Sequence, residues 1–381
     1  MEIPLISLCM IVKNEETILP RCLASVQGVV DEMIIVDTGS TDKTREIALA
    51  AGAKLYEFQW IDDFSAARNY SLAQASGHWI LVMDADEELE RDSGQRMRKL
   101  AQGDEADAYW VILRNFYRNR LQHTLDIPLL RFFRNHPNFR YRKRYHEDNR
   151  DSILESKGRI AHDKEGLIIF HDGYLHPSAQ GKPRVERAIQ TMRIALSEEP
   201  DNAWLMAKLG LELYSLGKKE EAYDLLYRLV AADPSALNFQ QMNLLDTHEA
   251  LAVLGDLAFQ RGEYTLTKFC GLAGRKLTEV FELRIYSELA VIGGTLGEVI
   301  QTVHQLQQAS SAPPKALTPE SISLLRQKQS ELSELEAEIQ NLLEGFTTLL
   351  TSSQRNLLRS WKNTCRQLTQ TLAKIISDQG E

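Results

Sequence analysis

The chain has 381 residues, of which 43% are hydrophobic and 25% charged, and its formal net charge is −9. This composition is typical of a globular protein, the length predicts two or three domains, and the acidic balance argues against nucleic acid as a partner. The four cysteines form no CxxC pair, so we expect reduced thiols rather than disulfides or a zinc site. No apolar run is long enough for a transmembrane segment and the first residues do not resemble a signal peptide. We therefore expect a cytoplasmic protein, with attachment to a membrane surface left open.

The first hundred residues alternate between short strands and helices. Apolar runs predict strands at residues 6–12, 32–37, 54–58 and 78–84, and helical patterns lie between them at 18–26, 41–53 and 63–75. This alternation predicts right-handed βαβ units and a mostly parallel sheet, as in a Rossmann-like α/β domain. Ligands of such sheets bind beyond the carboxyl ends of the strands. Asp37 and Asp84 follow two of these strands, which predicts a site at that edge.

The later part of the chain changes character. Further strands are predicted at 108–117, 127–133 and 166–174, and helical patterns dominate from about residue 180. We therefore expect a first domain at residues 1–178, a helical domain at 179–307, a linker at 308–321 and a helical hairpin at 322–381.

The helical domain resembles tetratricopeptide repeats in residues 203–234. Leu209-Gly210, Gly217, Ala222, Leu226 and Pro234 occupy that template's positions, and a weaker copy follows at Leu254-Gly255 and Gly262. Such helix pairs bind a peptide or partner in some proteins and only brace a neighbouring domain in others, and both alternatives remain open. An apolar stripe follows the linker at Leu332, Leu335, Ile339, Leu342, Phe346 and Leu349. It indicates a hairpin packed on the repeats or, alternatively, a homodimer through the helical region.

An acidic segment, Asp84-Ala85-Asp86-Glu87-Glu88, follows the apolar run Trp79–Met83. Carboxylates this close repel one another, so a positive partner is expected. One interpretation is an Asp-x-Asp that holds a divalent cation against the diphosphate of a nucleotide sugar. Another is the nucleophile and acid of a haloacid-dehalogenase-like phosphatase, although Glu88 stands where that motif has Thr or Val. The third is the acidic start of a helix.

Four segments, MIVKNEETILPRCLASV (10–26), IIVDTGSTDKT (34–44), FSAARNYSL (64–72) and ILVMDADEEL (80–89), together resemble the family 2 glycosyltransferases of the A-type glycosyltransferase fold. The resemblance continues more loosely through 144–148 and 170–177, and the layout is similar to bacterial peptide glycosyltransferases of the sublancin type. It implies an inverting, metal-dependent glycosyltransferase that uses Mn²⁺ or Mg²⁺. The donor would be a nucleotide sugar, expected to be a UDP-sugar, and the acceptor a peptide, protein or glycan.

The resemblance also implies roles for individual residues. Asp86 would bind the metal, and the donor would be bound by Val12, Asn14, Asp37, Thr38, Arg68 and Asp84. Many relatives have a second Asp where this chain has Thr38, which leaves the choice of base open.

The catalytic base is expected to be Glu147, with Asp148 as the next candidate, because an inverting enzyme needs a carboxylate within reach of the acceptor. His171 follows a predicted strand and is a candidate third metal ligand or, alternatively, a hydrogen-bonded structural histidine. The basic stretch 131–144 either faces the diphosphate or an anionic acceptor, or pairs with acids elsewhere.

Two other functions remain as alternatives: a phosphatase or nucleotidyltransferase, and a non-catalytic tetratricopeptide scaffold with a degenerate transferase domain. The chain has no Gly-rich, Lys-containing phosphate loop, which weakens the first. The presence of Asp37, Arg68, Asp84 and Asp86 argues against the second.

Overall fold

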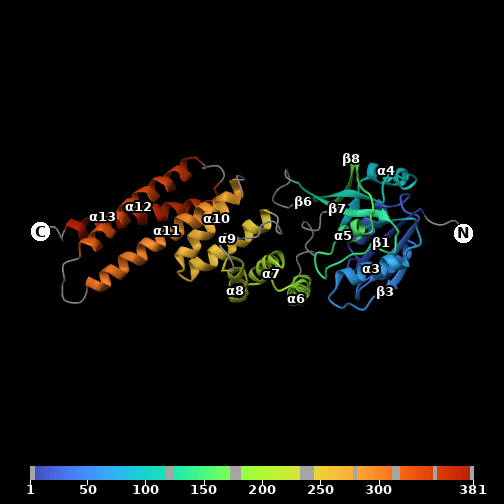
Figure 1. Ribbon diagram of the computed structural model, residues 1–381, viewed down its shortest axis with the longest axis horizontal. Helices are drawn as coiled ribbons and strands as arrows, with labels where there is room; N and C mark the ends of the chain where they lie inside the picture. Colours follow the sequence, from blue (N-terminus) through green and yellow to red (C-terminus); the bar gives the residue numbers. More distant parts are fainter. Residues whose placement is uncertain are drawn as a thin grey trace. The chain divides into compact units, whose positions relative to one another are not determined.

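The computed structural model of the chain comprises two compact units, Met1–Pro200 and Asp201–Glu381 (Figure 1). The residues that it describes are 5–116, 124–171, 182–231, 244–277, 281–310, 318–345 and 350–377. The sequence placed the first boundary after residue 178, whereas helix α6 (Lys182–Glu198) lies within the first unit. Its Glu198 pairs with Arg144, with 2.7 Å between Oε1 and Nη2.

The first unit is built on one mixed sheet of eight strands. Their order across the sheet is β3-β2-β1-β4-β7-β6-β8-β5. The bounds are β1 (Ile6–Val12), β2 (Glu32–Asp37), β3 (Lys54–Glu57), β4 (Trp79–Val82), β5 (Glu87–Leu89), β6 (Ala108–Phe116), β7 (Thr124–Arg134) and β8 (Ile160–His171). The half β3-β2-β1-β4 is parallel throughout, whereas β7 runs antiparallel to β4 and β6, and β5 antiparallel to β8. The predicted α/β class is confirmed, but the short strand β5 was not predicted.

Both faces of this sheet are buried, because its central strands are apolar on both sides. Ile6, Leu8 and Met10 of β1 belong to one core, and Cys9 of the same strand belongs to the other. Helices α1 (Leu19–Ser25), α2 (Thr44–Ala50) and α4 (Arg91–Ala101) contribute to the first core, and α3 (Phe64–Gln74) and α5 (Arg150–Glu155) to the second. With both faces covered, the loops at the carboxyl ends of the parallel strands are left to form a site.

The second unit begins with two similar helix pairs, α7 (Ala203–Ser215) with α8 (Lys219–Ala231), and α9 (Leu244–Gln260) with α10 (Tyr264–Leu277). Each pair turns at a glycine with positive φ, +77° at Gly217 and +76° at Gly262. A Cβ on Gly210 would lie 2.6 Å from Leu226, and one on Gly255 would lie 3.3 Å from Cys270, so both glycines permit close approach of the paired helix. The predicted helical region is therefore present as repeated pairs, while Pro234 of the template lies outside the described residues.

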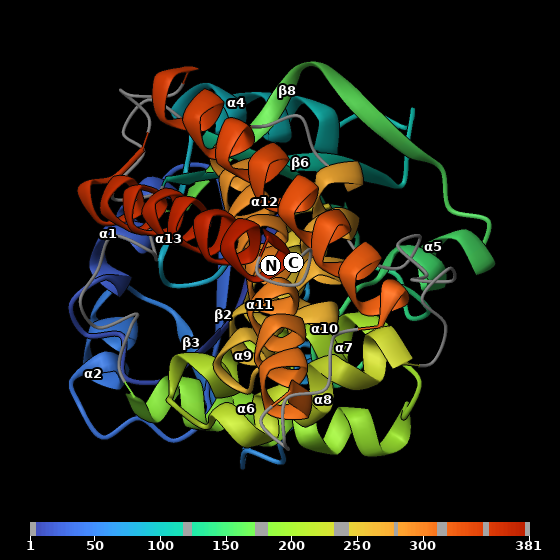
Figure 2. The ribbon, with the colours of Figure 1, turned by 90° about the vertical axis from the view of Figure 1, so that its left-hand side faces the viewer.

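Three long helices complete the second unit: α11 (Phe281–Ser310), α12 (Pro319–Gly345) and α13 (Ser352–Ser377). α12 and α13 lie side by side (Figure 2). The described part of the predicted stripe, Leu332 to Leu342, is buried in a core shared with α11 and α13, and Phe346 and Leu349 lie outside the described residues. Helices extend into the expected linker from both sides, to Ser310 and from Pro319. None of the helices in the described ranges combines the length and apolar character that a membrane crossing requires.

Candidate active site

The acidic segment forms a tight turn between β4 and β5. The Asp84 N–H donates to Glu87 Oε2 (2.8 Å), and the Glu87 N–H donates to the Asp84 carbonyl (3.1 Å). The Cys22 thiol of α1 also donates to that carbonyl, at 3.4 Å. The Glu87 side chain is only 2% exposed, compared with 31% for Asp84. The acids are therefore not equivalent, because Glu87 folds back under the turn and shapes it.

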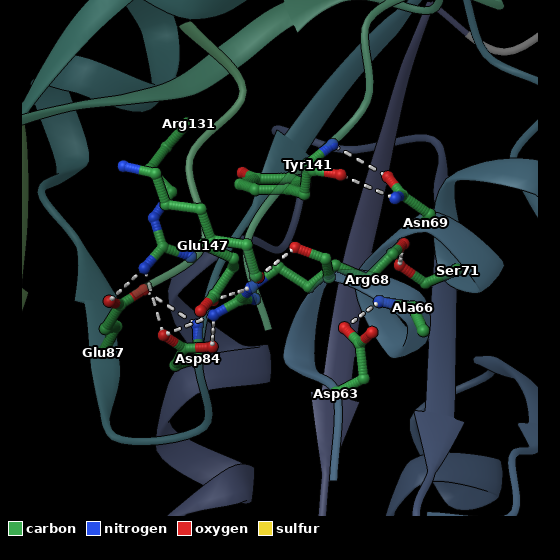
Figure 3. Close-up of polar contacts among 12 residues, drawn as sticks. Asp63, Ala66, Arg68, Asn69, Ser71, Asp84, Glu87, Arg131, Tyr141 and Glu147 are labelled. Carbon is green, nitrogen blue, oxygen red and sulfur yellow. Dashed lines mark hydrogen bonds and ion pairs between the residues drawn. The ribbon is translucent and has the colours of Figure 1, made fainter. Parts of the chain in front are cut away.

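Two buried arginines from distant segments neutralise this turn (Figure 3). Arg68 of α3 donates through Nη2 to Asp84 Oδ1 (2.8 Å) and through Nε to Glu147 Oε1 (2.6 Å). Arg131 of β7 donates through Nη2 to Asp84 Oδ2 (3.1 Å) and lies 3.7 Å from Glu87 Oε1. Burial alone would raise the pKa of Asp84, but these two guanidinium groups hold it well below its usual range. The positive partner that the acidic segment requires thus includes Arg68 and Arg131.

Glu87 responds in the opposite direction. Burial raises its pKa to about 7, against the charge of Arg131 and with further repulsion from Asp84 and Asp86. The Glu87 carboxyl is therefore partly protonated near neutral pH, while Asp84 beside it stays ionised.

Asp86, within the acidic turn, lies beside His171 at the end of β8. His171 Nε2 is 3.4 Å from Asp86 Oδ2, and His171 Nδ1 is 2.6 Å from Asn115 Oδ1. Burial lowers the pKa of His171, but the hydrogen bond and charge of Asp86, together with Glu87 and Asp84, raise it overall. The structure therefore brings the two predicted metal ligands into contact.

The donor atoms of Asp86 and His171 are chemically suited to a divalent cation. A carboxylate oxygen and an imidazole nitrogen both suit Mn²⁺, and Mg²⁺ is usually held by one or two carboxylates plus substrate phosphates. In the described ranges, no cluster of three or more His, Cys, Asp or Glu side chains forms a cage for a metal. Asp86 and His171 thus fit a cation whose coordination is completed by a ligand such as a diphosphate.

The predicted nucleoside-binding residues meet at the ends of β1 and β2. Val12 pairs in register with Asp37, and the Thr38 N–H and hydroxyl both donate to the Val12 carbonyl (2.9 and 3.1 Å). The Asp37 carboxylate accepts the N–H of Ser40 at 3.1 Å. Asn14, at φ +58°, accepts the Thr41 N–H at 2.7 Å and so joins the two strand ends. Because β1 lies between β2 and β4, these residues share the edge that carries Asp84.

The segment that carries Glu147 is held by α3. Asn69 donates to the Tyr141 carbonyl (2.8 Å) and accepts its N–H (2.9 Å), and the Phe64 N–H donates to the Arg144 carbonyl (3.0 Å). Glu147 is thereby placed against Arg68, with its side chain 13% exposed. Asp148 is exposed, and its carboxylate accepts the N–H of Arg150 at 3.1 Å. Of the two predicted bases, Glu147 is the one that contacts Arg68, which in turn contacts Asp84 of the acidic turn.

The basic stretch 131–144 divides between the two predicted roles. Arg134 pairs with Asp104 (2.8 Å), Arg142 with Glu155 and Arg144 with Glu198, all within the first unit. Arg131 contacts the acidic turn instead. Sequence reasoning did not single out Arg131 or Asn115. The available signal was a charged or polar residue within an otherwise apolar strand, one in LLRFF (129–133) and two in VILRNF (111–116).

A mixed, mostly parallel α/β sheet with an acidic turn after β4, followed by many helices, is the layout expected of a protein with an A-type glycosyltransferase-like domain. The family model described as Glycosyl transferase family 2 matches residues 7–159, which span most of the first unit. The resemblance predicted from the four motifs is thus confirmed.

Two relatives and one solved structure illustrate what the chain is similar to. A TPR repeat-containing protein of Synechococcus elongatus is 43% identical over 210 residues, which cover 54% of this chain and 51% of the relative. The SPbeta prophage-derived glycosyltransferase SunS of Bacillus subtilis is 28% identical over 68% of this chain and 60% of its own length. The chain thus spans about half to three fifths of these relatives. The crystal structure of S. aureus TarS 1-349 in complex with UDP-GlcNAc aligns with a TM-score of 0.39 and 14% identity, covering 74% of this chain and 90% of that chain.

Proposed function

We propose that this protein is an inverting, metal-dependent glycosyltransferase that moves a sugar from a UDP-sugar to a peptide, protein or glycan acceptor. The observation that carries the proposal is the placement of Asp86 beside His171, at the edge where Asp37 ends β2 and Asp84 follows β4. The match of residues 7–159 to the family 2 model supports it, as does the likeness to a relative named as a glycosyltransferase.

In this proposal, the nucleoside binds at the ends of β1 and β2. Val12 and Asn14 line the base pocket and Asp37 accepts hydrogen bonds from the nucleoside. Thr38 occupies the place of a second carboxylate, but its hydroxyl donates to the Val12 carbonyl, so we expect it to support the pocket wall rather than read the base. Asp84, oriented by Arg68 and Arg131, lies nearest the ribose.

Asp86 and His171 are the residues that would hold Mn²⁺ or Mg²⁺. A divalent cation bound there supplies positive charge against the departing diphosphate. Arg68 and Arg131 supply further positive charge at the site. Arg68 and Arg131 are buried and oriented before the donor arrives, so their reorganisation during the reaction costs little.

The displacement itself requires one proton acceptor. The acceptor's nucleophilic atom attacks the anomeric carbon, the bond from that carbon to the diphosphate oxygen breaks, and the electron pair leaves with the nucleoside diphosphate. Glu147 takes the proton from the attacking atom. Its contact with Arg68 Nε (2.6 Å) fixes the carboxylate near Asp84, and attack from the face opposite the leaving group inverts the anomeric configuration.

The proposal is tested by calorimetric titration of UDP with and without Mn²⁺, on wild type, Asp86→Asn and the control Asp92→Asn. Asp92 is an exposed acid on α4, so its substitution removes one carboxylate from the same unit while leaving the turn intact. We expect Mn²⁺ to strengthen UDP binding in wild type and the control, and Asp86→Asn to lose roughly 10- to 100-fold of that affinity. Metal-dependent binding would then justify a screen of UDP-sugars and acceptors.

Failure of UDP, GDP and CMP to bind the folded wild type under any metal condition would overturn the proposal. The scaffold alternative would then lead. Equal affinity of wild type and Asp86→Asn would show instead that nucleotide binds without the assigned metal ligand, and would remove the metal from the proposed mechanism.

A further inference from the structure

We propose that Asn115 is a positioning residue that selects the tautomer of His171, so that the ring presents an unprotonated Nε2 to Asp86. The inference rests on the proposed function, because an imidazole can ligate a metal only through a nitrogen that carries a lone pair.

The strand pairing brings the two side chains together. His171 of β8 is in register with Asn115 of β6 on one side and with Glu87 of β5 on the other. Neighbouring strands are about 4.8 Å apart, and residues in register project from the same face of a sheet. Asn115 Oδ1 accordingly lies 2.6 Å from His171 Nδ1, and Asp86, one residue before Glu87, lies on the Nε2 side of the ring.

The orientation of the Asn115 amide is determined by a second hydrogen bond. Its Nδ2 donates to the Leu113 carbonyl at 3.2 Å, and the residue is only 2% exposed. A flipped amide would place Oδ1 against that carbonyl, so that two acceptors would face one another at a buried position. Oδ1 therefore points to His171, and an amide oxygen can only accept a hydrogen bond.

This arrangement determines where the imidazole carries its proton. A nitrogen 2.6 Å from a carbonyl-type oxygen must be the N–H donor, so the neutral ring has its proton on Nδ1 and its lone pair on Nε2. In the protonated ring Nε2–H faces Asp86 Oδ2 at 3.4 Å. In the neutral ring a lone pair faces that oxygen instead, and a cation bound between these two acceptors would stabilise them. A free histidine side chain favours the proton on Nε2, so Asn115 reverses the intrinsic preference. Partners of this type commonly fix the ring orientation of metal-ligating histidines.

The tautomer is measured directly by long-range proton–nitrogen correlation spectra of the metal-free protein with ¹⁵N-labelled histidine. Spectra are recorded at a pH where the His171 ring is neutral, and His171→Gln assigns the signals. We expect the Nδ1–H form in wild type and in Asn115→Asp, which keeps an acceptor, and a shift toward Nε2–H in Asn115→Leu and Asn115→Ala. His248 is the internal reference, since its Nε2 lies 2.9 Å from Ser287 Oγ in the second unit.

Mn²⁺ affinity in the presence of UDP supplies the second readout. We expect Asn115→Leu and Asn115→Ala to weaken Mn²⁺ affinity about 10- to 100-fold, and Asn115→Asp to retain the affinity of wild type. An Nε2–H tautomer in wild type would overturn the inference whether or not the protein is a transferase. An unchanged tautomer or unchanged Mn²⁺ affinity in the Leu and Ala variants would do the same. An Nδ1–H ring in a wild type that binds no Mn²⁺ would retain the tautomer assignment while overturning its metal role, and the failure would then lie with the proposed function.

Discussion

The two halves of the sheet contribute to the same site by different means. The parallel half, β3-β2-β1-β4, carries Asp37 and Asp84 directly after its strands, where local turns present them. The other half, β7-β6-β8-β5, contributes Arg131, Asn115 and His171 from within or at the end of long strands. Residues of the first kind are marked by short motifs, whereas those of the second kind acquire their role through strand pairing. Substitutions in the two halves should therefore differ in their effects on catalysis, on stability and on its pH dependence.

The largest expected effect concerns Glu147, which lies in the segment between β7 and α5. Glu147→Gln removes the proposed base but keeps the shape of the side chain, so we expect kcat to fall about 10²- to 10⁴-fold while UDP affinity stays within about twofold. The measurement is UDP release from whichever of UDP-glucose, UDP-galactose and UDP-GlcNAc the enzyme turns over. Asp148→Asn is the matched control and should remain near wild type. The reverse pattern would move the base to Asp148.

The second effect concerns the stability of the acidic turn. Arg68→Met leaves Asp84 and Glu147 without their shared partner at a site where Arg68 is only 5% exposed, so we expect a loss of about 3–5 kcal/mol in the free energy of unfolding. Arg131→Met should cost less, because Asp84 keeps Arg68. Urea unfolding of each variant gives the values, with Arg142→Met, an exposed arginine of the same stretch, as a control that should match wild type. A larger loss for Arg131→Met would reverse the order of the two arginines.

The smallest expected effect is a pH dependence of the free energy of unfolding that arises from Glu87. Folding raises the pKa of Glu87 to about 7, so between its ordinary value and 7 the folded state binds more protons than the unfolded state. Stability contributed by this group therefore falls as pH rises through that window. Glu87→Gln removes this contribution, so its stability relative to wild type should increase by about 1–3 kcal/mol from pH 5 to pH 8.

Urea unfolding of wild type and Glu87→Gln at both pH values measures this change. Leu89→Ala, at a buried uncharged position of the same strand, is the control, because its cost of about 2–5 kcal/mol should not depend on pH. A Glu87→Gln difference that is the same at pH 5 and pH 8 would contradict a raised pKa for this carboxyl.

Much of the parallel half was predictable from the sequence. β1 and β2 have the predicted bounds, because apolar runs bounded by polar turns are local signals of buried strands. The placement of Asp37, Asp84 and Asp86 at one edge of the sheet was also predictable, and they remain candidate site residues because such sheets bind ligands at the carboxyl ends of parallel strands. His171 was predicted as a metal ligand beside Asp86 from its place after a predicted strand and from the donor chemistry of imidazole.

Only the tertiary structure decided the rest. Arg131 reaches Asp84 because β7 pairs antiparallel with β4, and Asn115 meets His171 because β6 and β8 pair in parallel. These contacts join residues 47 and 56 positions apart in the chain, so no local pattern encodes them. Side-chain period and turn residues determine that a strand forms and where it ends, whereas its neighbour and register depend on how the whole sheet buries its two faces. The sequence by itself thus determined which acids line the edge, and the fold determined which cations and hydrogen bonds orient them.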